Sequence, residues 1–81
     1  MTDNEILARI HELVEQEHVL RAKVQGREIS PEEEHARLQT AEEELDQLWD
    51  WLRRRRAARR AGADPDAVPE QPVTEVEGYL Q

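Results

Sequence analysis

The residues of this chain best suited to chemistry are histidines and glutamates spaced along predicted helices. Residues 11–18 read His-Glu-Leu-Val-Glu-Gln-Glu-His, which resembles the helical motif of zinc proteases. The second histidine comes seven residues after the first instead of four, and this spacing excludes that motif. Glu15 with His18, and Glu32 with His35, instead match the Glu-x-x-His pairs of di-iron helical bundles. Glu15, His18, Glu32 and His35 are therefore the metal-ligand candidates.

Helix geometry favours a different interpretation of the same residues. An ideal helix turns by about 100° per residue, which points Glu15 away from the apolar stripe and leaves His18 and His35 on its flank. Carboxylates are also so abundant, with 19 Asp and Glu in 81 residues, that a chance match is easy. We therefore expect solvated or bridging histidines, no metal and no other cofactor.

Arginines form the second cluster with chemical potential. They are Arg53, Arg54, Arg55, Arg56, Arg59 and Arg60. Because arginine binds phosphate through a planar fork, the cluster suggests nucleic-acid binding. Three simpler roles compete: favourable interaction with a helix C-terminus, compensation of the many carboxylates, and binding of an acidic tail or an acidic partner. The net charge of -8 opposes general binding to nucleic acid or anionic membranes, so weak nucleic-acid binding stays an alternative.

The rest of the sequence supplies no catalytic constellation. Thr2 and Ser30 are explained as helix caps, Thr40 and Thr74 lack a neighbouring base, and the three glycines are scattered. Cysteine is absent, which excludes disulfides and thiolate metal sites and fits a reducing cytosol. We expect no enzyme and assign no catalytic residue.

Two helices must position these side chains, and capping signals predict where each begins. Thr2 and Glu5 form a capping box that starts a helix over residues 3–25. Gly26 then suits the left-handed position after a helix end.

The second helix is predicted over residues 31–61. Ser30 is its cap, Pro31 fits the first position and Glu33 completes a second capping box. Gly62 and the prolines after it end the helix.

Both predicted helices carry an apolar stripe with alternating steps of three and four residues, which is typical of helices that pack together. Glu17 and Glu34 occupy positions of these stripes where an apolar residue is expected. In an antiparallel hairpin, Glu17 should approach Arg37 and Glu34 should approach Arg21, so we predict two crossed ion pairs between the helices. The alternative is that the helices are splayed and hydrated at this end.

A single hairpin of this size cannot bury both apolar stripes completely. Two helices cannot enclose one another, and 81 residues lie near the size at which a single core becomes marginal. We therefore predict an all-α antiparallel two-helix hairpin that forms a homodimeric four-helix bundle; binding a different protein through the same face competes with it. The predicted interface residues are Ile6, Ile10, Leu13, Leu45, Leu48, Trp49 and Leu52.

The chain divides into a helical hairpin over residues 1–62 and an acidic, proline-containing segment over residues 63–81. The prolines forbid continuous helix and favour an extended tail. Residues 73–81 alternate apolar and polar side chains, and both a docking segment and a frayed tail stay open.

Location follows from what a targeting segment would require. The longest apolar runs are only a few residues, and the first five residues are acidic where a secretory signal would be basic. We expect a cytoplasmic protein that does not bind membranes.

Three stretches together resemble a small uncharacterised, mainly actinobacterial family of unknown function. They are residues 4–14 (NEILARIHELV), residues 45–50 (LDQLWD) and residues 75–81 (EVEGYLQ), with the arginine cluster before the last. The resemblance covers nearly the whole chain. It implies no activity, cofactor or catalytic residue, and it implies that the ending from Val76 to Gln81 belongs to the domain.

The favoured function is therefore a non-catalytic helical module for protein interaction or assembly. It would dimerise and present its arginine end and C-terminal segment to a protein partner. The alternatives are a carboxylate–histidine metal-binding bundle and weak nucleic-acid binding through the arginine cluster.

Overall fold

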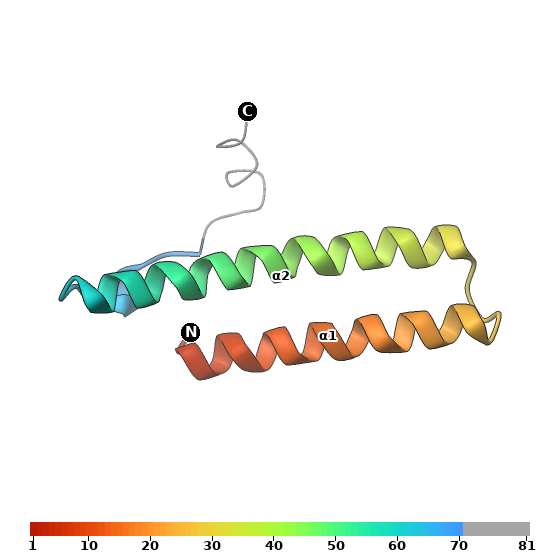
Figure 1. Ribbon diagram of the computed structural model, residues 1–81, viewed down its shortest axis with the longest axis horizontal. Helices are drawn as coiled ribbons and strands as arrows, with labels where there is room; N and C mark the ends of the chain where they lie inside the picture. Colours follow the sequence, from red (N-terminus) through yellow and green to blue (C-terminus); the bar gives the residue numbers. More distant parts are fainter. Residues whose placement is uncertain (71–81) are drawn as a thin grey trace, which may run out of the picture.

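The computed structural model describes residues 1–70 as an antiparallel helical hairpin (Figure 1). Its elements are α1 (Asp3–Gln25), α2 (Pro31–Arg60) and the 3-10 helix η1 (Pro65–Ala67), and residues 1–70 contain no strand. The end of α2 projects past the start of α1 (Figure 1). The all-α class is thus confirmed for this part of the chain, whereas the four-helix bundle stays a prediction. Residues 71–81, including the alternating segment, lie outside the described residues.

Helix α1 begins with the predicted capping box. The Thr2 hydroxyl accepts a hydrogen bond from the Glu5 backbone N–H at 3.2 Å, and the Glu5 carboxylate accepts from the Thr2 N–H at 3.4 Å. At the start of α2, Ser30 Oγ accepts from the Glu33 N–H at 3.1 Å. The reciprocal half of this second box is not formed, because the Glu33 carboxylate accepts from Arg37 Nη2 at 2.6 Å.

The turn between the helices corrects the prediction for Gly26. Gly26 has a φ of -80°, and the left-handed residue is Arg27, with a φ of 59°. The Glu28 N–H donates to the Lys23 carbonyl at 2.8 Å and the Arg27 N–H donates to the Val24 carbonyl at 3.0 Å, which is a Schellman motif. The motif lies one residue later than predicted, so the positive φ falls on a residue with a side chain.

Helix α2 ends with the same motif and the expected glycine. Gly62 has a φ of 76°, its N–H donates to the Arg59 carbonyl, and the Ala63 N–H donates to the Ala58 carbonyl at 2.8 Å. Because glycine has no Cβ, it adopts this conformation without steric cost.

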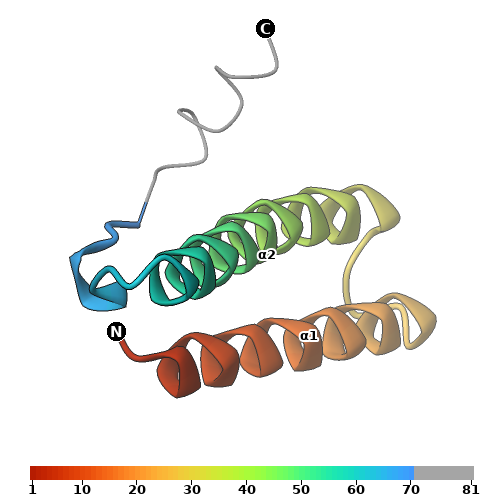
Figure 2. The same cartoon turned by 60° about the vertical axis from the view of Figure 1, so that its left-hand side comes forward.

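The core lies between the facing stripes of α1 and α2. Its buried members are Ile6, Ile10 and Leu13 from α1 and Ala41, Leu48, Trp51 and Leu52 from α2, with Leu7, Leu45 and Val68 packed against them. Val14 and Trp49 are exposed, whereas Trp51 is buried. Residues after α2 cover Trp51, because Val68 packs against the core and its carbonyl accepts a hydrogen bond from Trp51 Nε1. Figure 2 shows the chain turning back at the end of α2.

The crossed ion pairs predicted near the turn are not formed. Arg21 pairs with Glu17 of its own helix at 3.7 Å, and Arg37 pairs with Glu33 of its own helix. Each pair has the i, i+4 spacing that places two side chains on the same surface of one helix. These ion pairs therefore do not join the two helices near the turn.

Replacing the glycine at each helix end with alanine should have opposite effects on the free energy of unfolding. At Gly26 the backbone is already compatible with a side chain, and an added Cβ would lie 3.5 Å from its nearest neighbour, an ordinary contact. Gly26→Ala should therefore leave the free energy of unfolding unchanged or raise it by up to about 1 kcal/mol. Gly62→Ala should lower it by about 1–2 kcal/mol, because alanine resists a positive φ. Urea unfolding followed by circular dichroism measures both, and equal effects would contradict this account.

Candidate functional site

Arg55 connects three parts of the fold. Its side chain is buried, with 3% of the residue surface exposed. Nε donates to Asp3 Oδ1 at 2.8 Å, Nη1 donates to the Pro65 carbonyl at 2.9 Å and Nη2 donates to Asp66 Oδ1 at 3.0 Å. One guanidinium therefore holds the start of α1, the last turns of α2 and η1 together.

Asp3 is the carboxylate most affected by this network. Its hydrogen bond with Arg55, together with a second one from Arg59 Nη2 at 3.1 Å, holds the pKa of Asp3 below its usual value. The hydrogen bonds that Arg55 donates to Asp3 and to Asp66 raise the pKa of Arg55. Both groups are therefore charged in the folded chain at neutral pH.

Residues 64–70, hereafter the docked segment, lie against α2. The Asp64 carboxylate caps η1 by accepting from the Asp66 N–H at 2.9 Å. The segment then follows α2 back toward its middle. Side chains of α2 donate to it: Trp51 Nε1 to the Val68 carbonyl at 2.9 Å, Arg54 Nη1 to the Pro69 carbonyl at 2.8 Å, and Gln47 Nε2 to Glu70 Oε1 at 2.7 Å.

The predicted basic patch is divided by these contacts. Arg54, Arg55 and Arg59 bind groups of the chain itself, namely Asp50 and the docked segment, Asp3 and Asp66, and Asp3. Arg53, Arg56 and Arg60 are exposed and form no ion pair within residues 1–70. Only Arg54 and Arg55 contact the docked segment, and the Arg55–Asp66 pair is the ion pair between the cluster and an acidic residue of that segment within residues 1–70.

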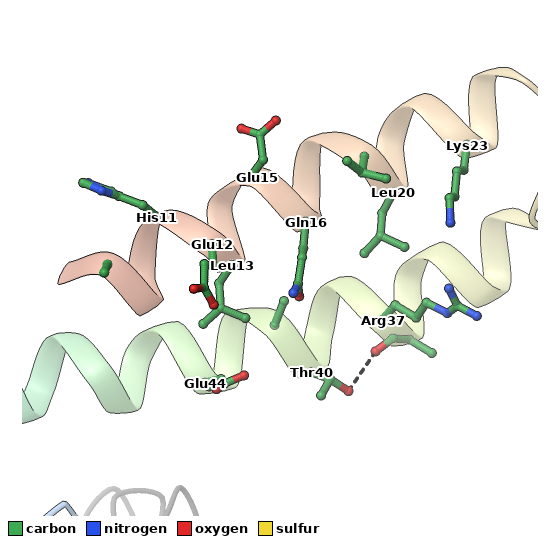
Figure 3. Close-up of a pocket in the computed structure, with 14 residues that line it drawn as sticks. His11, Glu12, Leu13, Glu15, Gln16, Leu20, Lys23, Arg37, Thr40 and Glu44 are labelled. Atoms are coloured by element: carbon green, nitrogen blue, oxygen red, sulfur yellow. Dashed lines mark hydrogen bonds between the residues drawn. The ribbon is translucent and has the colours of Figure 1, made fainter. Parts of the chain in front are cut away.

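A groove of about 950 Å³ continues along the same side of the hairpin, between α1 and α2 (Figure 3). Apolar side chains lining it include Leu13, Val19, Leu20, Ala36 and Ala41. Glu70 binds Gln47, and Glu44, one helical turn before Gln47, belongs to the groove wall. The docked segment therefore ends at the entrance of the groove.

The charges around this groove are separated along its length. Near the entrance, Arg9 bridges the helices by donating to both carboxylate oxygens of Glu44, at 3.0 and 3.1 Å, and it also donates to Glu12 at 3.0 Å. Hydrogen bonds to Glu12 and Glu44 raise the pKa of Arg9. At the far end, toward the turn, the groove carries Lys23 and Arg37 (Figure 3).

The opposite side of the hairpin is an exposed apolar face, hereafter the open face. Trp49 and Val14 are 40% and 39% exposed. Trp49 is two residues, or about 200°, from both Trp51 and Gln47, which hold the docked segment. Val14 is related in the same way to Glu12 and Gln16 of the groove. The half-buried Leu7 and Leu45 complete this face.

Most of the predicted interface residues are buried between the two helices of a single chain. Ile6, Ile10, Leu13, Leu48 and Leu52 are each at most 3% exposed and already pack between α1 and α2. Of the predicted set, only Leu45 and Trp49 reach the surface of residues 1–70. A dimer built on this fold must therefore use them together with neighbours that the prediction omitted.

The metal-ligand candidates do not gather. His18, His35, Glu15 and Glu32 are all exposed, and within residues 1–70 no three His, Asp or Glu side chains are close enough to hold a metal ion. The metal site was predicted across two chains, so a site between copies stays untested.

The sequence carried a signal for Arg55 that the prediction overlooked. The stripe of α2 proceeds Leu45, Leu48, Leu52, and its next step is Arg55. The stripe of α1, followed backwards from Ile6, reaches Asp3. One basic and one acidic residue at matching stripe positions indicate a buried ion pair. The role of Asp66 had no such signal, because it depends on where the segment after α2 lies.

Comparison with known proteins identifies relatives over almost the whole chain. Residues 2–81 match a family described as "Protein of unknown function (DUF2630)". Uncharacterised proteins of Mycobacterium bovis and of two strains of Mycobacterium tuberculosis are each 49% identical over 78 residues, covering 96% of this chain and 90% of the relative. These sources agree with the actinobacterial resemblance, whereas the specific ending from Val76 to Gln81 stays a prediction. No solved structure matches the chain.

In residues 1–70, neither helix has the length and apolarity that crossing a membrane requires.

Acid should remove the stabilisation that Asp3 provides. The folded pKa of Asp3 is lowered, so the carboxylate stabilises the fold above its unfolded pKa of about 3.9, and this contribution is lost as the pH falls through the folded pKa. Asp3→Asn should therefore melt at a lower temperature than the parent chain at neutral pH, and the difference should shrink below about pH 3.

Thermal unfolding across this pH range provides the measurement. Asp46→Asn is the matched control, because Asp46 is exposed and forms no ion pair or hydrogen bond within residues 1–70. A constant difference between the Asp3 variant and the parent chain at all pH values would contradict the role of the charge.

Proposed function

We propose that this chain, which belongs to the DUF2630 family of proteins of unknown function, is a non-catalytic helical module that assembles as a two-fold dimer through its open face. The observation that carries the proposal is the exposed Trp49. An indole side chain is costly to leave in water and is typical of interface centres. Trp51 is covered by the docked segment, whereas the described part of the chain leaves Trp49 open.

The open face has the composition of a small interface. Its centre contains Trp49, Leu45, Leu7 and Val14, all of which retain surface that the single hairpin does not cover. Two such faces packed together would complete the second layer that a pair of helices lacks. The resulting four-helix arrangement keeps Leu45 and Trp49 of the predicted interface and replaces its buried members with Leu7 and Val14.

Charged residues on α2 indicate how the two copies would be oriented. Glu42 lies seven residues before Trp49 and Arg53 lies four residues after it, so all three share one side of α2. Both charged residues are exposed and neither forms an ion pair within residues 1–70. If the two α2 helices run antiparallel about an axis midway between these residues, Glu42 lies opposite the partner's Arg53 and Trp49 lies beside the partner's Leu45.

A further protein partner fits the surface that this dimer leaves free. Arg55 connects α2 to α1, and α2 continues beyond it to Arg60. Arg60 is exposed. An acidic surface is the complementary partner for such an end. The proposal retains the cytoplasmic location inferred from the sequence.

Charge exchange tests the dimer directly. Glu42→Arg and Arg53→Glu should each weaken dimerisation, by about tenfold in Kd, because each variant places like charges opposite one another. The double variant, which restores opposite charges, should recover most of the loss. Analytical ultracentrifugation over a concentration series measures the three constants.

Two controls separate assembly from folding. Glu43→Arg makes the same charge change one residue along α2, about 100° away from Glu42, and should leave the Kd nearly unchanged. Trp49→Ala should abolish dimerisation while the helical circular dichroism is retained. A parent chain that is folded and monomeric at micromolar concentration would overturn the proposal.

A further inference from the structure

The groove between α1 and α2 has an apolar lining and an entrance but no occupant within residues 1–70. The buried Leu13 and Leu20 line it, and so does Val19, which is 46% exposed. Leaving such a lining in water is unfavourable, so a covering segment would stabilise the fold. This groove is on the opposite side of the hairpin from the open face, so what covers it is independent of the proposed dimer.

We infer that the groove is the docking site of the chain's own residues 71–81. The first argument is direction. The docked segment runs along α2 from the Arg55 network past Arg54 to Gln47, where Glu70 is hydrogen bonded. The next step in the same direction is Glu44, which lines the groove, and then Thr40 and Arg37. The segment therefore leaves Glu70 at the groove entrance.

The second argument is length. Seven residues of α2 separate Gln47 from Thr40 near the middle of the groove, a distance of about 10 Å at 1.5 Å per residue. The six residues from Glu70 to Val76 span about 20 Å when extended and about 9 Å when helical. An extended segment from Glu70 to Val76 therefore reaches the middle of the groove.

The third argument is chemical complementarity. The segment supplies Val73, Val76, Tyr79 and Leu80 for an apolar lining. It also contains Glu75 and Glu77, which suit Lys23 at the end of the groove near the turn, where Arg37 already pairs with Glu33. The family match extends to residue 81, so this segment belongs to the same unit as the hairpin.

Disulfide trapping in the full chain tests the inference, because the chain has no cysteine of its own. The test pair is Gln16→Cys with Val76→Cys, since Gln16 points between the helices in the groove (Figure 3). The control pair is Gln39→Cys with Val76→Cys. Gln39 neighbours Thr40 on α2, is exposed and is not part of the groove lining. The two pairs therefore share the cysteine at position 76 and differ in whether the second cysteine lies in the groove or outside it.

Docking predicts that the Gln16 pair closes within one chain about tenfold faster than the Gln39 pair, because a docked segment raises the effective concentration at the groove alone. Mass spectrometry distinguishes closure within a chain from linkage between chains. Equal rates would overturn the inference. Linkage between copies would also overturn it, because the occupant would then be a second copy's segment.

A measurement without a covalent trap guards against distortion by the disulfide. A nitroxide spin label at Gln16→Cys should broaden the amide signals of residues 73–80, and the same label at Gln39→Cys should affect them far less. Equal broadening from the two positions would overturn the inference. Because the open face is untouched, the Kd of dimerisation reports separately on the proposed function.

Discussion

The buried guanidinium of Arg55 is the interaction on which the rest of this fold depends. Removing an arginine from water is costly unless its donors are satisfied. Here the acceptors come from Asp3, Pro65 and Asp66, which belong to two different parts of the chain. The charge therefore fixes where α1 starts against α2 and where the chain goes after α2. Apolar side chains provide most of the contact between the helices, but they are less specific about register than a guanidinium with three directed hydrogen bonds.

The path taken after α2 makes the two sides of the hairpin different. On one side, the docked segment covers Trp51 and leads to the groove. On the other side, Trp49 lies two residues along the same helix and remains exposed. Two tryptophans of similar sequence context thus have opposite environments. Within residues 1–70, one face of the hairpin is therefore covered by the chain itself and the other face leaves apolar side chains exposed.

Local signals in the sequence were sufficient for the helices but not for the path of the segment after them. The Thr2 capping box, the Ser30 cap and Gly62 act within a few residues, so the hairpin could be predicted from them. The burial of Trp51 and the exposure of Trp49 could not be predicted in this way, because they depend on where residues 64–70 lie. The predicted crossed ion pairs do not form, because Glu17 and Glu33 each pair with an arginine four residues later in the same helix. For the candidate site, Arg55 and Asp3 were detectable from the stripe pattern, whereas Asp66 and the groove required the fold.

The separation of bonded residues along the chain also orders the assembly of the hairpin. The Schellman motif at Arg27 joins near neighbours, whereas Arg55 and Asp3 are 52 positions apart. Closing a long loop costs more entropy than closing a short one, and contacts between distant residues form slowly unless nearer ones have already shortened the path. We therefore expect the contacts of the connecting turn to form before the contact between Arg55 and Asp3.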